Sequence, residues 1–194
     1  QPMVFKMNAA LGSVEDVSKI EAVDNDRLSV ARNAYLRELS KHTTWPEESL
    51  VIDKLPLNLL KAPLIHQAFP EAKFILALRH PFDCILSCWM QTFKLNTAMA
   101  NMVDLDRIVD FYCVAMDIFH LSQKRYGLNV YRIRYEDLIE DFEAETTSIL
   151  RFFGLEWESG LVNYQETALA RPKINTPSHS QVIKPIYKTA SYRW

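Results

Sequence analysis

The segment RHPFDCILS, residues 79–87, carries the residue types best suited to chemistry in this chain. It follows the apolar run FILAL, which predicts a buried strand, and a helical pattern begins at Pro81. Arg79 would therefore leave the strand just before the helix, and Ser87 would lie about one or two turns into that helix. Helix N-termini attract anions because their first backbone amides lack partners. The segment predicts a phosphate site.

The same residues also have a purely structural interpretation. A strand, a turn and a helix with a polar residue at the junction occur in any α/β domain, and Arg79 can simply pair with a carboxylate such as Asp83. Short motifs recur by accident, so this segment alone does not decide between the two interpretations.

Two more short apolar runs, at residues 49–53 and 129–133, predict strands that also end in polar residues. Asp53 and Lys54 follow the first run, and the sequence RYED, residues 134–137, follows the second. In a parallel sheet, ligands bind outside the carboxyl ends of the strands. Lys54 could instead salt-bridge a carboxylate, and the acids of RYED could simply begin a helix. Three polar strand ends together favour a binding site.

Between these runs the apolar residues recur at helical spacing. The expected helices cover residues 13–23, 25–41, 55–69, 81–93, 105–126, 143–153 and 157–169. Alternating strands and helices predict an α/β fold with a parallel sheet and helices on both of its faces. From residue 171 the periodicity is lost, but apolar residues persist, so we expect this tail to lie across the domain as a binding loop.

The composition limits the class of protein. The chain has 194 residues, 48% of them hydrophobic, which suits a single domain over residues 1–194. A net charge of −2 argues against sequence-independent binding of nucleic acid. No run approaches the roughly 18 apolar residues of a membrane span. Three cysteines without metal-ligand spacing predict reduced thiols in a cytoplasmic protein without a metal site.

Four motifs occur in an order that resembles a known family. They are DKLPLN, FPEAKFILALRHPFDCILS, RYEDL and the closing TPSHSQVIKPIYKTASYRW. From about residue 50 to the last residue, the chain resembles the sulfotransferases that use 3′-phosphoadenosine 5′-phosphosulfate (PAPS), especially the tyrosylprotein-sulfotransferase-like and bacterial branches. The resemblance implies a P-loop NTPase-like fold with a three-layer arrangement around a parallel sheet.

The resemblance also implies which residues bind the nucleotide. Arg79 and Ser87 would hold the 3′-phosphate, the arginine as a charge-assisted fork. Tyr135 would lie on the adenine side, and Arg193 would add a second cation to the 3′-phosphate. Ser178 would lie near the 5′-phosphosulfate.

The implied reaction moves a sulfuryl group from PAPS to a hydroxyl or amine acceptor and releases adenosine 3′,5′-bisphosphate. Lys54 would approach the bridging and sulfuryl oxygens, where negative charge grows as the S–O bond breaks. Such a transfer needs in-line positioning and cations aimed at the developing charge, and the resemblance implies no metal. Lys54 and Ser178 are therefore the expected catalytic residues.

The chain departs from the family at its beginning. The family's first strand and its glycine-, serine- and threonine-containing loop around the 5′-phosphosulfate have no counterpart, because none of the four glycines follows a buried strand. We expect that an N-terminal portion is missing, the alternative being a degenerate relative that cannot hold the 5′ end. The general base is left unassigned, since Glu15 and Glu21 are better explained as exposed helix residues, and His66 and His80 as structural residues.

Two other functions stay open. A P-loop-type kinase would need a glycine-rich loop ending in Lys and Ser or Thr, which the chain lacks. A non-catalytic nucleotide-binding or interaction domain of the same fold would keep the motifs without the reaction. The acceptor class and the oligomeric state cannot be predicted from these residues.

Overall fold

The computed structural model describes residues 2–13, 19–44, 49–93, 96, 98–163, 166, 191–192 and 194. The chain divides into two compact units. The first comprises Gln1–Phe74 and Ala115–Asn129, and the second comprises Ile75–Val114 and Val130–Trp194.

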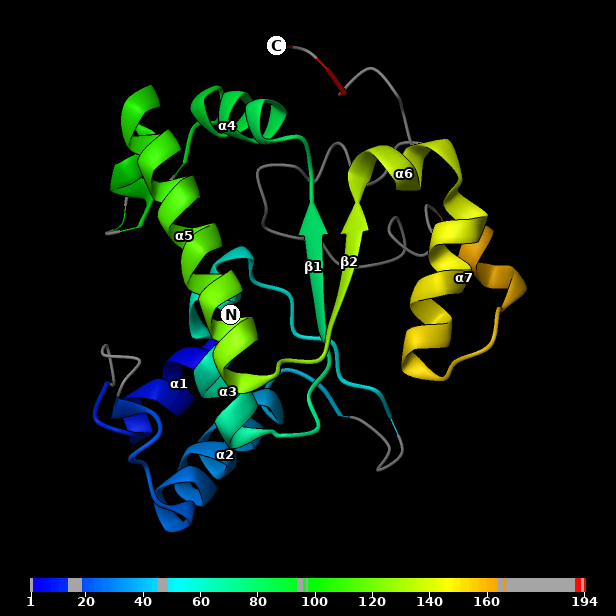
Figure 1. Cartoon of the computed structure of the whole chain (residues 1–194). Helices are drawn as coiled ribbons and strands as arrows, with labels where there is room; N and C mark the ends of the chain where they lie inside the picture. Colours follow the sequence, from blue (N-terminus) through cyan, green and yellow to red (C-terminus); the bar gives the residue numbers. More distant parts are fainter. Residues whose placement is uncertain are drawn as a thin grey trace. The chain divides into compact units, whose positions relative to one another are not determined.

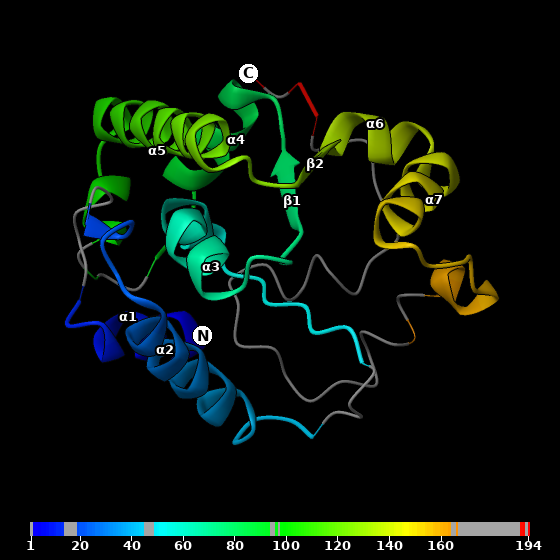
Figure 2. The same ribbon diagram turned by 60° about the horizontal axis from the view of Figure 1, so that its bottom comes forward.

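The first unit is helical and contains a continuous apolar core. Its elements are α1 (Pro2–Ala10), α2 (Asn25–Leu39), the 3-10 helix η2 (Pro56–Lys61), α3 (Ala62–Ala68) and the second half of α5 (Leu105–Tyr126). Helices α1 and α2 lie side by side in both ribbon views (Figures 1 and 2). The core side chains are Met3, Val4, Met7, Leu11, Ile20, Val23, Leu28, Ala31, Tyr35, Leu39, Leu64 and Ala68.

Helix α2 shows why this sequence folds locally as a helix. Its buried apolar residues recur every three or four positions, from Leu28 to Leu39, so they form one stripe that faces the core. Asp24 is its N-cap, and the Asp24 carboxylate accepts the backbone N–H of Arg27 at 2.8 Å. The helix predicted to begin after Asp24 is therefore confirmed.

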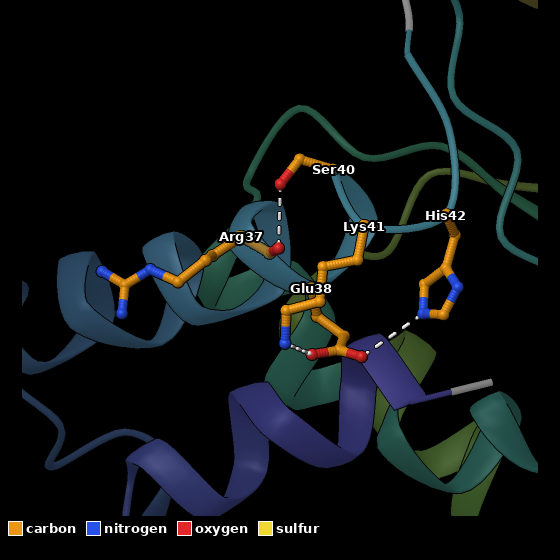
Figure 3. A network of polar contacts seen from close by, with 5 residues as sticks. All are labelled: Arg37, Glu38, Ser40, Lys41 and His42. Carbon is orange, nitrogen blue, oxygen red and sulfur yellow. Dashed lines mark hydrogen bonds and ion pairs between the residues drawn. The ribbon is translucent and has the colours of Figure 1, made fainter.

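At the end of α2, the Glu38 carboxylate contacts the side chains of Lys41 and His42 (Figure 3). Lys41 Nζ donates to Glu38 Oε2 at 2.7 Å, and His42 Nε2 lies 3.3 Å from Glu38 Oε1. The hydrogen bond from Lys41, followed by that from His42, lowers the pKa of the Glu38 carboxyl. The Lys41 cation also suits this position, since the C-terminal end of a helix carries partial negative charge.

The strand predicted at residues 49–53 is wrong. This segment has no regular secondary structure and pairs with no strand in the part of the chain that the structure describes. A buried strand needs its apolar side chains covered, yet Ile52 is 78% exposed, and Leu50 and Val51 are exposed too. The segment is held instead by its last residue, because Tyr35 donates its hydroxyl to Asp53 Oδ2 at 3.0 Å.

The second unit contains a two-stranded parallel sheet. Strand β1 covers Phe74–Leu78, strand β2 covers Val130–Arg134, and the two arrows in Figure 1 point the same way. Leu76 and Ile133 are the buried side chains of these strands. Both predicted strands are confirmed to within one residue, and the fold class is confirmed as α/β with a small parallel sheet.

Helices flank these strands along the chain. The second unit has α4 (Pro81–Trp89), the 3-10 helices η3 (Met99–Met102) and η4 (Ser159–Asn163), α6 (Tyr135–Glu140), α7 (Phe142–Phe153) and the first half of α5. Asp141 caps α7 by accepting the N–H of Ala144, and Gly154 ends it with a positive φ of 73°. No helix in the described ranges is long and apolar enough to cross a membrane.

The predicted helices agree with the structure where periodicity was strong. Helix α5 has the predicted bounds, and Gly127, with φ 62°, follows it as expected. Helix α1 was not predicted, and of the helix expected at 13–23 the described residues 20–22 form a turn. In the region predicted as a helix at 157–169, the structure describes residues 157–163, of which 159–163 form η4, and residue 166. The tail from residue 171 to 190 lies outside the described residues.

The contact between Tyr35 and Asp53 predicts a measurable loss of stability. Burial, then the charge of Asp53, raises the pKa of the Tyr35 phenol, so the phenol remains the donor across the ordinary pH range. Tyr35→Phe keeps the edge-on ring contact with Phe69 at 5.1 Å but removes the hydrogen bond. We expect a loss of about 1–2 kcal/mol in the free energy of unfolding, measured by urea denaturation.

Tyr131→Phe is the matched control. Its ring contact with Phe152 would persist, and the described residues show no hydrogen bond from its hydroxyl. Equal stability of wild type and Tyr35→Phe would contradict the role given to this contact.

Candidate functional site

The candidate site lies in the second unit, where β1 turns into α4. β1 ends at Leu78, Arg79 and His80 form the turn, and Pro81 occupies the first turn of α4. Proline fits there because its fixed φ suits the helix and its missing N–H is not needed. His80 is the N-cap but contributes no side-chain cap in the described structure, so the α4 terminus presents its positive dipole end beside Arg79.

Arg79 is held from two sides. Its Nη2 atom lies 3.9 Å from Asp83 Oδ1, one turn into α4. Its Cζ atom lies 5.5 Å from the centre of the Tyr135 ring, at the start of α6. The Arg79 side chain is 22% exposed. The Arg79 side chain is therefore oriented by protein groups and still partly exposed.

A buried carboxylate joins the two strand ends. Glu136, 7% exposed, accepts the backbone N–H of His80 on its Oε1 atom at 2.8 Å. Its Oε2 atom lies 3.9 Å from Arg134 Nε. These contacts connect the turn after β1 with the end of β2 and the start of α6, so the predicted convergence of these two strand ends is confirmed for Arg79, Tyr135 and Glu136.

The last residues of the chain contact the same turn. The Tyr192 backbone N–H donates to Oδ2 of Asp83 at 2.6 Å. The Trp194 indole stacks on the His80 ring, with centroids 4.7 Å apart and planes 16° apart, and meets the edge of Phe82 at 5.0 Å. An aromatic cluster of His80, Phe82, Tyr192 and Trp194 thus lies beside the N-terminus of α4.

The remaining predicted site residues are not all described. Ser87 is half-buried on α4, one turn after Asp83 and on the same face of the helix. Lys54 belongs to the first unit, where it is exposed in the segment before η2. Ser178 and Arg193 lie outside the described residues. The functional roles of all four stay predictions.

The two acids that were considered as a general base are Glu21 and Glu15. Glu21 lies in a turn and accepts two hydrogen bonds from the Arg125 guanidinium, at 2.7 and 2.8 Å. Glu15 is not among the described residues. His66 lies within α3, as expected.

Sequence reasoning missed the parts played by Asp83 and Glu136. The sequence predicts Asp83 only as a partner that would make Arg79 structural, and Glu136 as a polar residue at a strand end or a helix-start acid. The structure shows the Arg79–Asp83 ion pair, but it also shows that Asp83 is fully buried and binds Tyr192. The four-residue spacing of Arg79 and Asp83 was visible in the sequence, whereas the partner 109 residues away was not.

Two cysteines lie on α4 next to this site. Cys84 and Cys88 are free thiols one helical turn apart. A hydrogen bond between them raises the pKa of Cys84, and the same hydrogen bond together with the positive charge of Arg79 lowers the pKa of Cys88 to about 7. Cys88 is therefore the thiolate of the pair near neutral pH. Within the described ranges, no cluster of metal-ligating side chains occurs.

Comparison with known proteins identifies the family. The family model described as Sulfotransferase family matches residues 7–159, most of the chain. The chain belongs to the sulfotransferase family. An uncharacterized protein of Aquifex aeolicus is 30% identical over 175 residues, which are 88% of this chain and 22% of that protein.

Named sulfotransferases are similar as well. Protein-tyrosine sulfotransferase 2 of Gallus gallus is 25% identical over 181 residues, 89% of this chain and 47% of that protein. Cytosolic sulfotransferase 15 of Arabidopsis thaliana is 30% identical over 111 residues, 52% of this chain and 30% of that protein. This sulfotransferase-family chain thus spans less than half the length of these curated relatives.

The thiol pair predicts a pH profile for alkylation. Only the thiolate reacts, so the rate of Cys88 modification by iodoacetamide should rise through a midpoint near pH 7 and then level off. Mass spectrometry of the peptides separates Cys88 from Cys84 and Cys113. Cys84→Ala, which removes the S–H donor, should move the midpoint to higher pH. A wild-type midpoint near 9, the ordinary thiol value, would contradict the hydrogen-bonded pair.

Proposed function

We propose that this chain binds PAPS and transfers its sulfuryl group to a hydroxyl or amine acceptor, releasing adenosine 3′,5′-bisphosphate. The observation that carries the proposal is the position of Arg79, partly exposed at the end of β1 beside the N-terminus of α4. Membership of the sulfotransferase family supports the type of reaction.

The 3′-phosphate fits the chemistry of this turn. It is a compact anion, and the guanidinium offers several N–H donors in one plane. The α4 dipole adds positive potential, and the Ser87 hydroxyl is a neutral donor farther along the same helix. Since Asp83 and Tyr135 already orient Arg79, little side-chain freedom would be lost when the phosphate binds.

The rest of the donor would be bound by residues assigned from the resemblance. Tyr135 begins α6 and would lie on the adenine side, Arg193 would add a cation at the 3′-phosphate, and Ser178 would lie near the 5′-phosphosulfate. These roles are part of the proposal.

The reaction needs no change in oxidation state. The acceptor oxygen or nitrogen attacks sulfur, the bond between sulfur and the bridging oxygen breaks, and the acceptor proton passes to a base. Lys54 would stabilise the negative charge that develops on the bridging oxygen. A relative named for protein tyrosine supports a hydroxyl acceptor, and relatives named cytosolic support a cytoplasmic location.

The binding step can be tested by calorimetry on the full-length protein. Adenosine 3′,5′-bisphosphate should bind more tightly than adenosine 5′-monophosphate, which lacks the 3′-phosphate. Arg79→Ala removes a charge-assisted contact worth about 1.5–3 kcal/mol, so it should weaken bisphosphate binding about 10- to 100-fold. The affinity for the monophosphate should change little.

Arg151→Ala is the matched control. Arg151 is an exposed arginine in the last turn of α7, so its replacement removes the same charge from the same unit. Equal bisphosphate affinities for wild type, Arg79→Ala and Arg151→Ala would reject the assignment of the 3′-phosphate.

The transfer step needs its own assay. With labelled PAPS and both a phenol and a tyrosine peptide as acceptors, Lys54→Ala should lower turnover by orders of magnitude while leaving bisphosphate affinity nearly unchanged. Tight bisphosphate binding without transfer to either acceptor would favour the non-catalytic nucleotide-binding alternative.

A further inference from the structure

The fully buried carboxylate of Asp83 has partners from two distant parts of the chain. Its Oδ1 atom faces the Arg79 guanidinium at 3.9 Å, and its Oδ2 atom accepts the Tyr192 N–H at 2.6 Å. Burying a carboxylate is costly unless charge and hydrogen bonds compensate for the lost water. Oδ1 of Asp83 therefore depends on the turn just before α4, whereas Oδ2 depends on a group from the end of the chain.

The contact between Asp83 and the Tyr192 amide is not a helix cap within α4. An acid in the first turn of a helix ordinarily interacts with that helix's own amides and dipole. Asp83 instead binds an amide 109 positions away in the sequence. The rings of His80 and Phe82 add apolar contact with Trp194 on the same helix terminus.

These contacts join the last residues of the chain to the arginine of the candidate phosphate site. Tyr192 and Trp194 are the sequence neighbours of Arg193. Movement of the Asp83 carboxylate would release the Tyr192 amide and remove the anionic partner of Arg79 at the same time. One buried group thus controls two elements of the site.

We infer that Asp83 is a positioning residue that fastens Tyr192, and with it the end of the chain, to the N-terminus of α4 and fixes the direction of Arg79. The inference deepens the proposed function, on which its ligand-binding part rests. Asp83 itself, being anionic, does not bind the phosphate.

The test compares Asp83→Asn and Asp83→Ala with the control Asp106→Asn. Asp106 is an exposed acid in the first turn of α5, so its replacement reports the loss of a helix-dipole interaction alone. Circular dichroism and thermal melting establish that each variant is folded. If Asp83→Ala does not fold, Asp83→Asn, which keeps the shape of the side chain and one acceptor, still decides.

The first measurement is hydrogen exchange of the C-terminal peptide in the nucleotide-free, full-length protein. Loss of the charge-assisted bond should accelerate exchange at Tyr192 about tenfold in Asp83→Asn and more in Asp83→Ala. Asp106→Asn should exchange like wild type. Unchanged exchange in both Asp83 variants would overturn the inference.

The second measurement is the affinity for adenosine 3′,5′-bisphosphate and for adenosine 5′-monophosphate. Misdirection of Arg79 should weaken bisphosphate binding about tenfold and monophosphate binding less than twofold, a split that general destabilisation would not produce. Equal losses for both ligands, or none, would overturn the positioning of Arg79.

The two measurements separate this inference from the proposed function. If wild type binds neither nucleotide, the proposed function fails, whereas the exchange result still supports or rejects Asp83 as the anchor of Tyr192. Accelerated exchange together with a loss confined to the bisphosphate supports the whole inference.

Discussion

The hydrogen bond from the His80 amide to the buried carboxylate of Glu136 is the contact on which the candidate site depends. It connects the turn after β1 to the start of α6, and therefore fixes where Arg79 leaves its strand relative to Tyr135. Parallel pairing of β1 and β2 brings the strand ends to one edge, but pairing alone does not set the geometry of the turns beyond them. Glu136 supplies that constraint at a position shielded from water, where a charge-assisted hydrogen bond is strong.

The electrostatics of the site are local. The whole chain has a net charge of only −2, so no overall positive field directs anions to it. Arg79 and the dipole of α4 supply positive potential at one turn, while Asp83 and Glu136 are buried close by. Buried acids beside an anion site reduce its net charge, and they also hold its cation in place. We therefore attribute the expected affinity to orientation of Arg79 as much as to charge.

The sequence predicted those strands and helices that a local residue pattern is sufficient to identify. FILAL and the run at 129–133 became strands, and α4 and α5 have clear starts and helical periodicity. The prediction failed at residues 49–53, because apolar side chains in a short run do not reveal whether a neighbouring strand covers them. It missed α1, whose buried Met3 and Met7 face α2 partners that no local pattern identifies.

The candidate site, like the fold, was predicted only in part. The meeting of Arg79 with Tyr135 followed from the rule that parallel strands end at one edge. The contacts of Asp83 with Tyr192 and of Glu136 with His80 could not be predicted from this rule. These hydrogen bonds join residues 109 and 56 positions apart, and no short sequence pattern indicates such a pair. The family resemblance named Arg79, whereas only the structure shows what orients it.

The central claim is that Arg79 and the N-terminus of α4 form the subsite for the nucleotide's 3′-phosphate. A crystal structure of the full-length protein with adenosine 3′,5′-bisphosphate tests it most directly. The account predicts the 3′-phosphate within hydrogen-bonding distance of the Arg79 guanidinium, with Glu136 still bound to the His80 amide. A nucleotide bound with its 3′-phosphate on other residues, and Arg79 paired only with Asp83, would contradict it.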